Sequence, residues 1–86
     1  MDKVITEIKR HYEFIHQARK DIAELRKQRA LMKAPLWEEA TGTVDAKKDY
    51  IKSKIADYDY NISLKEAEIE YSYNLIDILL FEVDDE

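Results

Sequence analysis

Residues 51–80 read IKSKIADYDYNISLKEAEIEYSYNLIDILL, and this stretch decides the fold. Its apolar residues recur at spacings of three, four and seven, which place them on one face of a helix. The members of this face are Ile51, Ile55, Tyr58, Ile62, Ile69, Tyr73, Ile76 and Leu80. Such a narrow stripe is typical of a helix that packs against one neighbouring helix.

The same stretch carries a second apolar stripe about 180° around the helix from the first. It consists of Tyr60, Leu64, Ala67, Tyr71, Leu75 and Ile78. One neighbouring helix can cover only one of the two faces, and a large apolar patch left in water usually marks an interaction surface. We therefore expect the second stripe to bind a partner, either another protein or a second copy of the chain.

The neighbouring helix is expected at residues 2–33, where Val4, Ile8, Ile15, Ala18, Ile22, Leu25 and Met32 form a stripe with a roughly seven-residue repeat. Ala34 and Pro35 are predicted to end this helix, because the residue before a proline avoids the helical region. Residues 34–43 then form a connector with a short helical turn, in which Gly42 suits a left-handed conformation. Thr43 is predicted to cap a second helix over residues 44–81, followed by an acidic tail at 82–86.

The fold class predicted from these elements is all-α. It is a single-domain antiparallel two-helix hairpin, similar to a coiled coil, because a short connection favours antiparallel packing. Pairing of two second stripes would extend the hairpin to a homodimeric four-helix bundle. The 86 residues include one Gly, one Pro and no Cys, which leaves little room for a sheet and none for disulfides.

Charge is distributed unevenly along the chain. Residues 1–33 hold nine basic and five acidic side chains, whereas residues 34–86 hold five basic and fourteen acidic ones. Acids on the second helix could orient a basic partner and accelerate binding. The candidate partner-binding acids are Asp57, Asp59, Glu66, Glu68 and Glu70, and Asp77 extends the row. A row of carboxylates can also imitate a phosphate backbone and occupy a basic nucleic-acid channel.

Two resemblances bear on function. In size and charge the chain resembles small acidic phage-encoded inhibitors, including anti-CRISPR proteins, which implies an inhibitor that occupies a partner surface. Trp37 before the second helix, together with the Tyr73–Asp77 spacing, resembles the WXG100 hairpins exported by type VII secretion. That resemblance implies a secreted dimer of hairpins, but Glu39 stands where the motif has glycine.

Other functional classes find little support in the sequence. Glu13 and His16 have the Glu-x-x-His spacing of di-iron bundles but lie away from the main stripe, so no metal site is predicted. No nucleophile–base pair or phosphate-binding loop is apparent, so we expect no enzyme and no cofactor. The basic flank of the first helix is interpreted as a solvated surface, with no direct nucleic-acid binding.

No stretch is apolar enough to span a membrane, and no secretory signal is apparent. We therefore expect a cytoplasmic protein, with secretion without a cleaved signal left open. A structural coiled-coil subunit is the remaining alternative.

Overall fold

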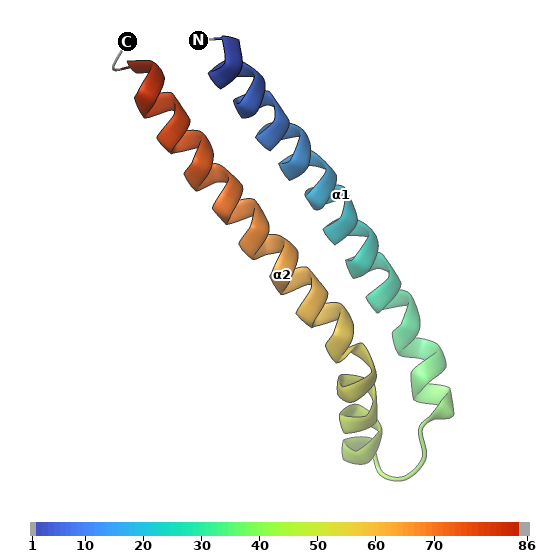
Figure 1. The fold of residues 1–86 in the computed structure, drawn as a ribbon. Helices are drawn as coiled ribbons and strands as arrows, with labels where there is room; N and C mark the ends of the chain where they lie inside the picture. Colours follow the sequence, from blue (N-terminus) through green and yellow to red (C-terminus); the bar gives the residue numbers. More distant parts are fainter. Residues whose placement is uncertain (1, 85–86) are drawn as a thin grey trace.

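The computed structural model describes the backbone of residues 2–84 and the side chains of residues 3–81. Two helices, α1 (Asp2–Glu39) and α2 (Val44–Asp84), run antiparallel and are joined by residues 40–43 (Figure 1). The Cα atoms extend over 65 × 16 × 11 Å, so the hairpin is a thin rod. The predicted all-α two-helix hairpin is confirmed.

Two seven-residue repeats build the contact between the helices. On α1 the repeat passes through Ile15 and Ile22, and on α2 it passes through Ile55, Ile62 and Ile76. All five side chains are buried, as a heptad seam requires. Among the described side chains, the other buried residues are Ala18, Leu36, Ala40 and Ser72.

The start of α2 lies where its capping residue predicts. The backbone N–H of Ala46 donates to Oγ1 of Thr43 at 3.2 Å, which satisfies one of the free N–H groups in the first turn. Just before the cap, Gly42 takes a left-handed φ of 101°, a conformation that only glycine adopts without strain. These two residues turn the chain and begin the second helix.

The end of α1 was predicted wrongly. The helix does not stop at Lys33 but continues through Pro35 to Glu39, so the connector is residues 40–43 rather than 34–43. Pro35 still leaves the carbonyl of Leu31 without its usual helical donor. The extension is nevertheless stabilised because Leu36 and Ala40 are buried there.

Two polar contacts tie this last part of α1 to α2. The hydroxyl of Tyr50 donates to Oε2 of Glu39 at 3.3 Å. Nζ of Lys47 lies 5.0 Å from the centre of the Trp37 ring, within the range of a cation–π interaction. Trp37 therefore belongs to the helix and not to a free connector.

Replacing Pro35 with Ala should stabilise the hairpin. The new N–H can donate to the carbonyl of Leu31, and a proline inside a helix costs ~3 kcal/mol relative to alanine. Because the site lies near the helix end, we expect a gain of about 1–2 kcal/mol in the free energy of unfolding in urea. An unchanged or lowered value would mean that α1 ends before Pro35 in solution.

The C-terminal end of α2 also differs from the prediction. The helix extends to Asp84, beyond the expected end at Phe81, so much of the expected acidic tail is helical backbone. Residues 85–86 of that tail lie outside the described residues.

Within the seam, Ser72 is buried and Leu79 is half-buried, whereas Leu80, predicted to be part of the packed stripe, is exposed. Ser72 lies three heptads after Ile51, and Leu79 lies three heptads after Tyr58. A seven-residue repeat therefore places both residues in the seam.

Candidate protein-binding face

The second apolar stripe, here called the outer stripe (Tyr60, Leu64, Ala67, Tyr71, Leu75, Ile78), lies on the side of α2 away from α1. Tyr60 is 64% exposed and Tyr71 65%, and Leu64, Ala67 and Ile78 are exposed as well. Only Leu75 is half-buried. No described residue of the chain therefore covers the outer stripe as a whole.

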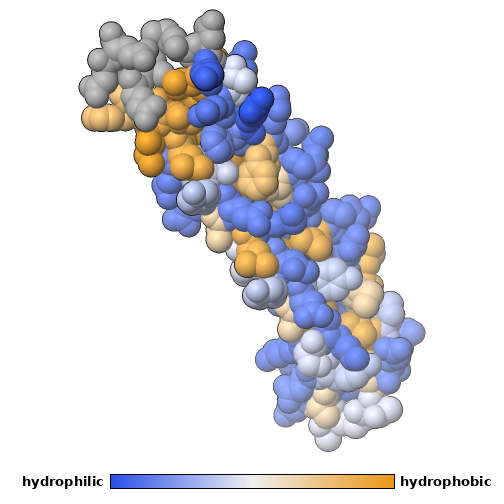
Figure 2. Space-filling model, in the orientation of Figure 1, coloured by the Kyte–Doolittle hydropathy of each residue, from blue (hydrophilic) through white to orange (hydrophobic). Residues whose placement is uncertain are grey.

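The surface of the molecule is not uniformly polar (Figure 2). Apolar side chains gather toward the end of the rod where the chain termini lie, and polar ones separate them nearer the connection. The outer stripe spans α2 from its middle to this end, because it includes Tyr60 and Ile78. A partner that buried Tyr71 and its large apolar neighbours would gain about 1.5–3 kcal/mol for each fully buried side chain.

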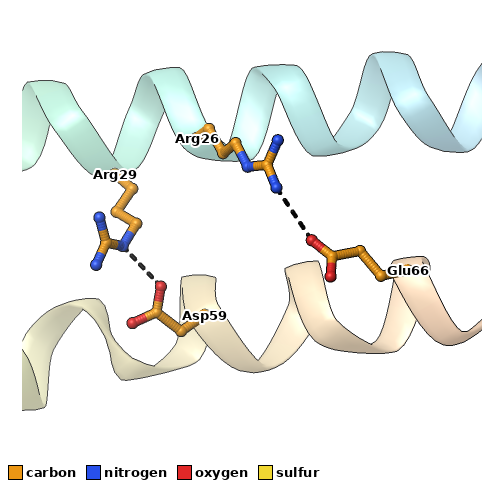
Figure 3. A network of polar contacts seen from close by, with 4 residues as sticks. All are labelled: Arg26, Arg29, Asp59 and Glu66. Carbon is orange, nitrogen blue, oxygen red and sulfur yellow. Dashed lines mark hydrogen bonds and ion pairs between the residues drawn. The ribbon is translucent and has the colours of Figure 1, made fainter.

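The predicted acids of α2 divide into two groups. Asp59 and Glu66 face α1, where they pair with arginines (Figure 3). Nη2 of Arg26 donates to Oε1 of Glu66 at 3.1 Å. Nε of Arg29 lies 2.7 Å from Oδ1 of Asp59, a close ion pair rather than an aligned hydrogen bond. These two acids are engaged in holding the hairpin, each with at most ~1 kcal/mol expected for an exposed pair.

Asp57, Glu68 and Glu70 form the second group. They are exposed, and within the described part of the chain no ion pair joins them to a lysine or arginine. With ~100° per residue, the outer stripe lies within about 40° of the direction of Tyr71. On the same scale Asp57 and Glu68 lie about 40–60° to one side of Tyr71, and Glu70 about 100° to the other. Asp57 and Glu68 therefore border the outer stripe, whereas Glu70 lies on the flank of α2 that carries Asp59 and Glu66.

The edge of the hairpin beside Asp57 and Glu68 contains a shallow depression. It is lined by Leu25, Asn61, Leu64, Lys65 and Glu68, so both helices contribute to it. Nζ of Lys65 lies 3.4 Å from Oδ2 of Asp21, which fixes α1 beside α2 at this point. The outer stripe thus continues into a depression between the helices.

Phe14 was missed as a candidate by the sequence reasoning. It precedes Asp21 by one heptad and is 42% exposed, while Leu75 follows Glu68 by one heptad on the facing helix. In an antiparallel pair a heptad step on each helix keeps both residues on the same edge. Phe14 therefore lies on the edge that carries Leu75, but its seven-residue spacing from Asp21 points to this edge only once the contact of Asp21 with Lys65 is known.

The residues considered for metal binding are not brought together. Glu13 and His16 are both exposed. Among the described side chains, no group of three or more His, Cys, Asp or Glu residues is close enough to hold a metal ion. Neither helix, over its described residues, contains a segment that could cross a lipid bilayer.

The two residues that suggested an export hairpin have roles within the fold. Nη2 of Arg19 donates to the hydroxyl of Tyr73 at 2.6 Å, and its guanidinium carbon lies 5.7 Å from the centre of the Tyr73 ring. Trp37 lies inside α1, two residues before the helix ends. Hairpin packing therefore accounts for both positions.

Fold and surface together define a class: a two-helix hairpin with one helix face uncovered. Comparison with known proteins adds no family to this description, because no family model, curated protein or solved structure matches the chain.

Proposed function

We propose that this protein is a non-enzymatic binding module that docks the outer stripe of α2 onto another protein. The single observation that supports the proposal is the exposure of large side chains along one straight face, with Tyr60, Tyr71 and Ile78 each more than half exposed. Tyrosines are enriched among residues that dominate binding energy. Inhibition by occupying a partner surface, as in a small phage-type inhibitor, is the specific form of the proposal.

Apolar docking is favoured over imitation of nucleic acid. Mimicry needs a continuous row of free carboxylates, and Asp59 and Glu66 are already paired with arginines of α1. Of the other candidate acids, Asp57 and Glu68 border the outer stripe and Glu70 lies on the opposite flank of α2, so these three form no single row. They suit the rim of a protein interface, where charge guides association.

A homodimer is the second candidate, because two outer stripes could pack into a four-helix bundle. Its mass would be twice 10.2 kDa, so sedimentation separates it from a hetero-complex. A structural coiled-coil subunit would use the same surface. A WXG100-like export protein would need Tyr73 accessible, whereas this residue is half-buried.

Photo-crosslinking in the cells that make the protein tests the docking surface. A photoreactive amino acid at Tyr71 or at Ile78 should give a discrete adduct. The matched control is Leu31, which is as exposed as Tyr71, at 65%, but lies on α1 outside the stripe. Replacing Leu64 with Ala should reduce the Ile78 adduct by about tenfold, the effect expected of an anchor residue. Equal crosslinking at Leu31 and at the stripe, or none at the stripe, would overturn the proposed function.

A further inference from the structure

We infer that the occupant of the outer stripe is a basic amphipathic helix of another protein, lying along the edge of the hairpin that carries Phe14 and Leu75. This inference rests on the proposed function and specifies the chemistry of its partner. It follows from the shape of the face, from the charges around it and from the poor fit of a second copy.

The shape of the face suits a helix. The stripe advances by four, three, four, four and three residues, so its side chains form a nearly straight row along α2. An amphipathic helix can match such a row with anchors at similar spacing. The depression at Leu25 and Leu64 lies on one edge of this row. A helix placed there would contact both α1 and α2 and complete a three-helix arrangement.

The charges around the face suit lysine and arginine. Asp57 and Glu68 border the stripe on this edge, and neither has a cation partner among the described side chains. The cations of the described ion pairs contact other acids, since Arg26, Arg29 and Lys65 pair with Glu66, Asp59 and Asp21 and not with Asp57 or Glu68. A separate depression near the connection is lined by Arg29, Lys33, Lys48, Lys52, Ile51 and Ile55, so basic side chains gather away from the stripe. Opposite charges across an interface raise the association rate and reject partners of like charge.

A second copy fits this face less well than a basic helix. An antiparallel pairing of two outer stripes that sets Ala67 of one copy against Tyr71 of the other places a small side chain opposite a large one. In that arrangement Glu68 lies within one turn of the two-fold axis and faces the same residue of the second copy. Like charges that face each other across an interface are destabilising, so the acids around the stripe disfavour self-association.

Two synthetic helical peptides of about three heptads provide the test. Both carry leucine on one face, and the other face is lysine-rich in one peptide and glutamate-rich in the other. Binding is followed by the change in fluorescence anisotropy of a labelled peptide added to the intact chain. We expect the basic peptide to bind at least about tenfold more tightly than the acidic one, and binding to weaken as salt increases.

Position-specific variants separate recognition from general attraction to an acidic protein. Asp57→Asn with Glu68→Gln removes two unpaired acids beside the stripe, and we expect at least a fivefold loss of affinity, as for a pair of interface charges. Asp59→Asn with Glu66→Gln is the matched control: it makes the same chemical changes on the same helix, but at acids paired with α1. A second control, Glu13→Gln with Asp49→Asn, leaves the hairpin ion pairs intact. Both controls should change affinity by less than about twofold, since a screened charge outside the interface contributes little. Circular dichroism verifies that all three variants stay helical.

Each outcome decides the inference. Equal loss of affinity in all three variants would show attraction by net charge alone and would overturn it. If the two peptides bind with equal affinity, or if neither binds, a basic helix is not the partner and this inference is overturned. In that case a Tyr71 adduct would still support the docking surface, so the two proposals can fail separately. A chain that sediments as a dimer at micromolar concentration and crosslinks to itself through Tyr71 would assign the face to a second copy.

Discussion

Ile76→Ala is expected to unfold the hairpin or bring it close to unfolding. Ile76 is 2% exposed in the seam of α2, and truncation of a buried isoleucine to alanine costs about 2–5 kcal/mol. Small domains have a total stability of ~5 kcal/mol at the low end of the usual range. We therefore expect a large fall in the thermal midpoint, measured by circular dichroism, with loss of helicity at 37 °C.

Ile78→Ala is the matched control for this prediction. It makes the same chemical change two residues further along the same helix, where the side chain is 57% exposed. We expect a change of less than about 0.5 kcal/mol in the free energy of unfolding, as is usual for a surface substitution. Similar losses at Ile76 and Ile78 would mean that the outer stripe is already packed in solution, and the candidate face would then be part of a core.

Leu36→Ala should separate the last turns of α1 from α2. Leu36 is 5% exposed and supports the part of α1 that continues beyond Pro35. Without this contact the cost of proline in the helix is no longer offset, and α1 should end near residue 33. We expect a loss of about 2–4 kcal/mol, the range for a buried leucine truncated to alanine.

Trp37 reports this local change because it is the only tryptophan in the chain. Its fluorescence emission should shift to longer wavelength in Leu36→Ala, since the cation–π contact with Lys47 and the surrounding packing are lost. Leu31→Ala, at a 65% exposed position on the same helix, should leave both stability and emission unchanged. A Leu36→Ala variant with unchanged emission would contradict the role assigned to Leu36.

Much of the candidate face could be predicted from the spacing of apolar residues. Helical periodicity alone separates Tyr71 and Ile78 from Ile62 and Ile76, because they point in opposite directions from one helix. The contribution of Phe14 could not be predicted with the same ease. Its placement beside the face depends on which edges of α1 and α2 meet, and that becomes known only from contacts such as Asp21 with Lys65.

The sequence places Asp57 and Glu68 on a different flank of α2 from Asp59 and Glu66, but it does not show which flank meets the arginines of α1. Asp57 and Asp59 are only two residues apart, and each is followed by a tyrosine. Only the way the two helices pack decides which flank of α2 faces Arg29, so that Arg29 reaches Asp59 and leaves Asp57 without a cation. Long arginine side chains span the gap between helices, so their choice of partner follows from three-dimensional distance and not from sequence spacing.

Local interactions determined the elements of this protein, and its sequence is sufficient to identify them. Two apolar faces on α2, the cap at Thr43 and the left-handed Gly42 all follow from preferences that act within a few residues. Tertiary structure alone decided that α1 continues beyond Pro35 to Glu39. The burial of Leu36 against the second helix outweighs the local preference of proline to end a helix. It also decided which acids remain free to meet a partner, because ion pairing across the hairpin depends on how the two helices are aligned.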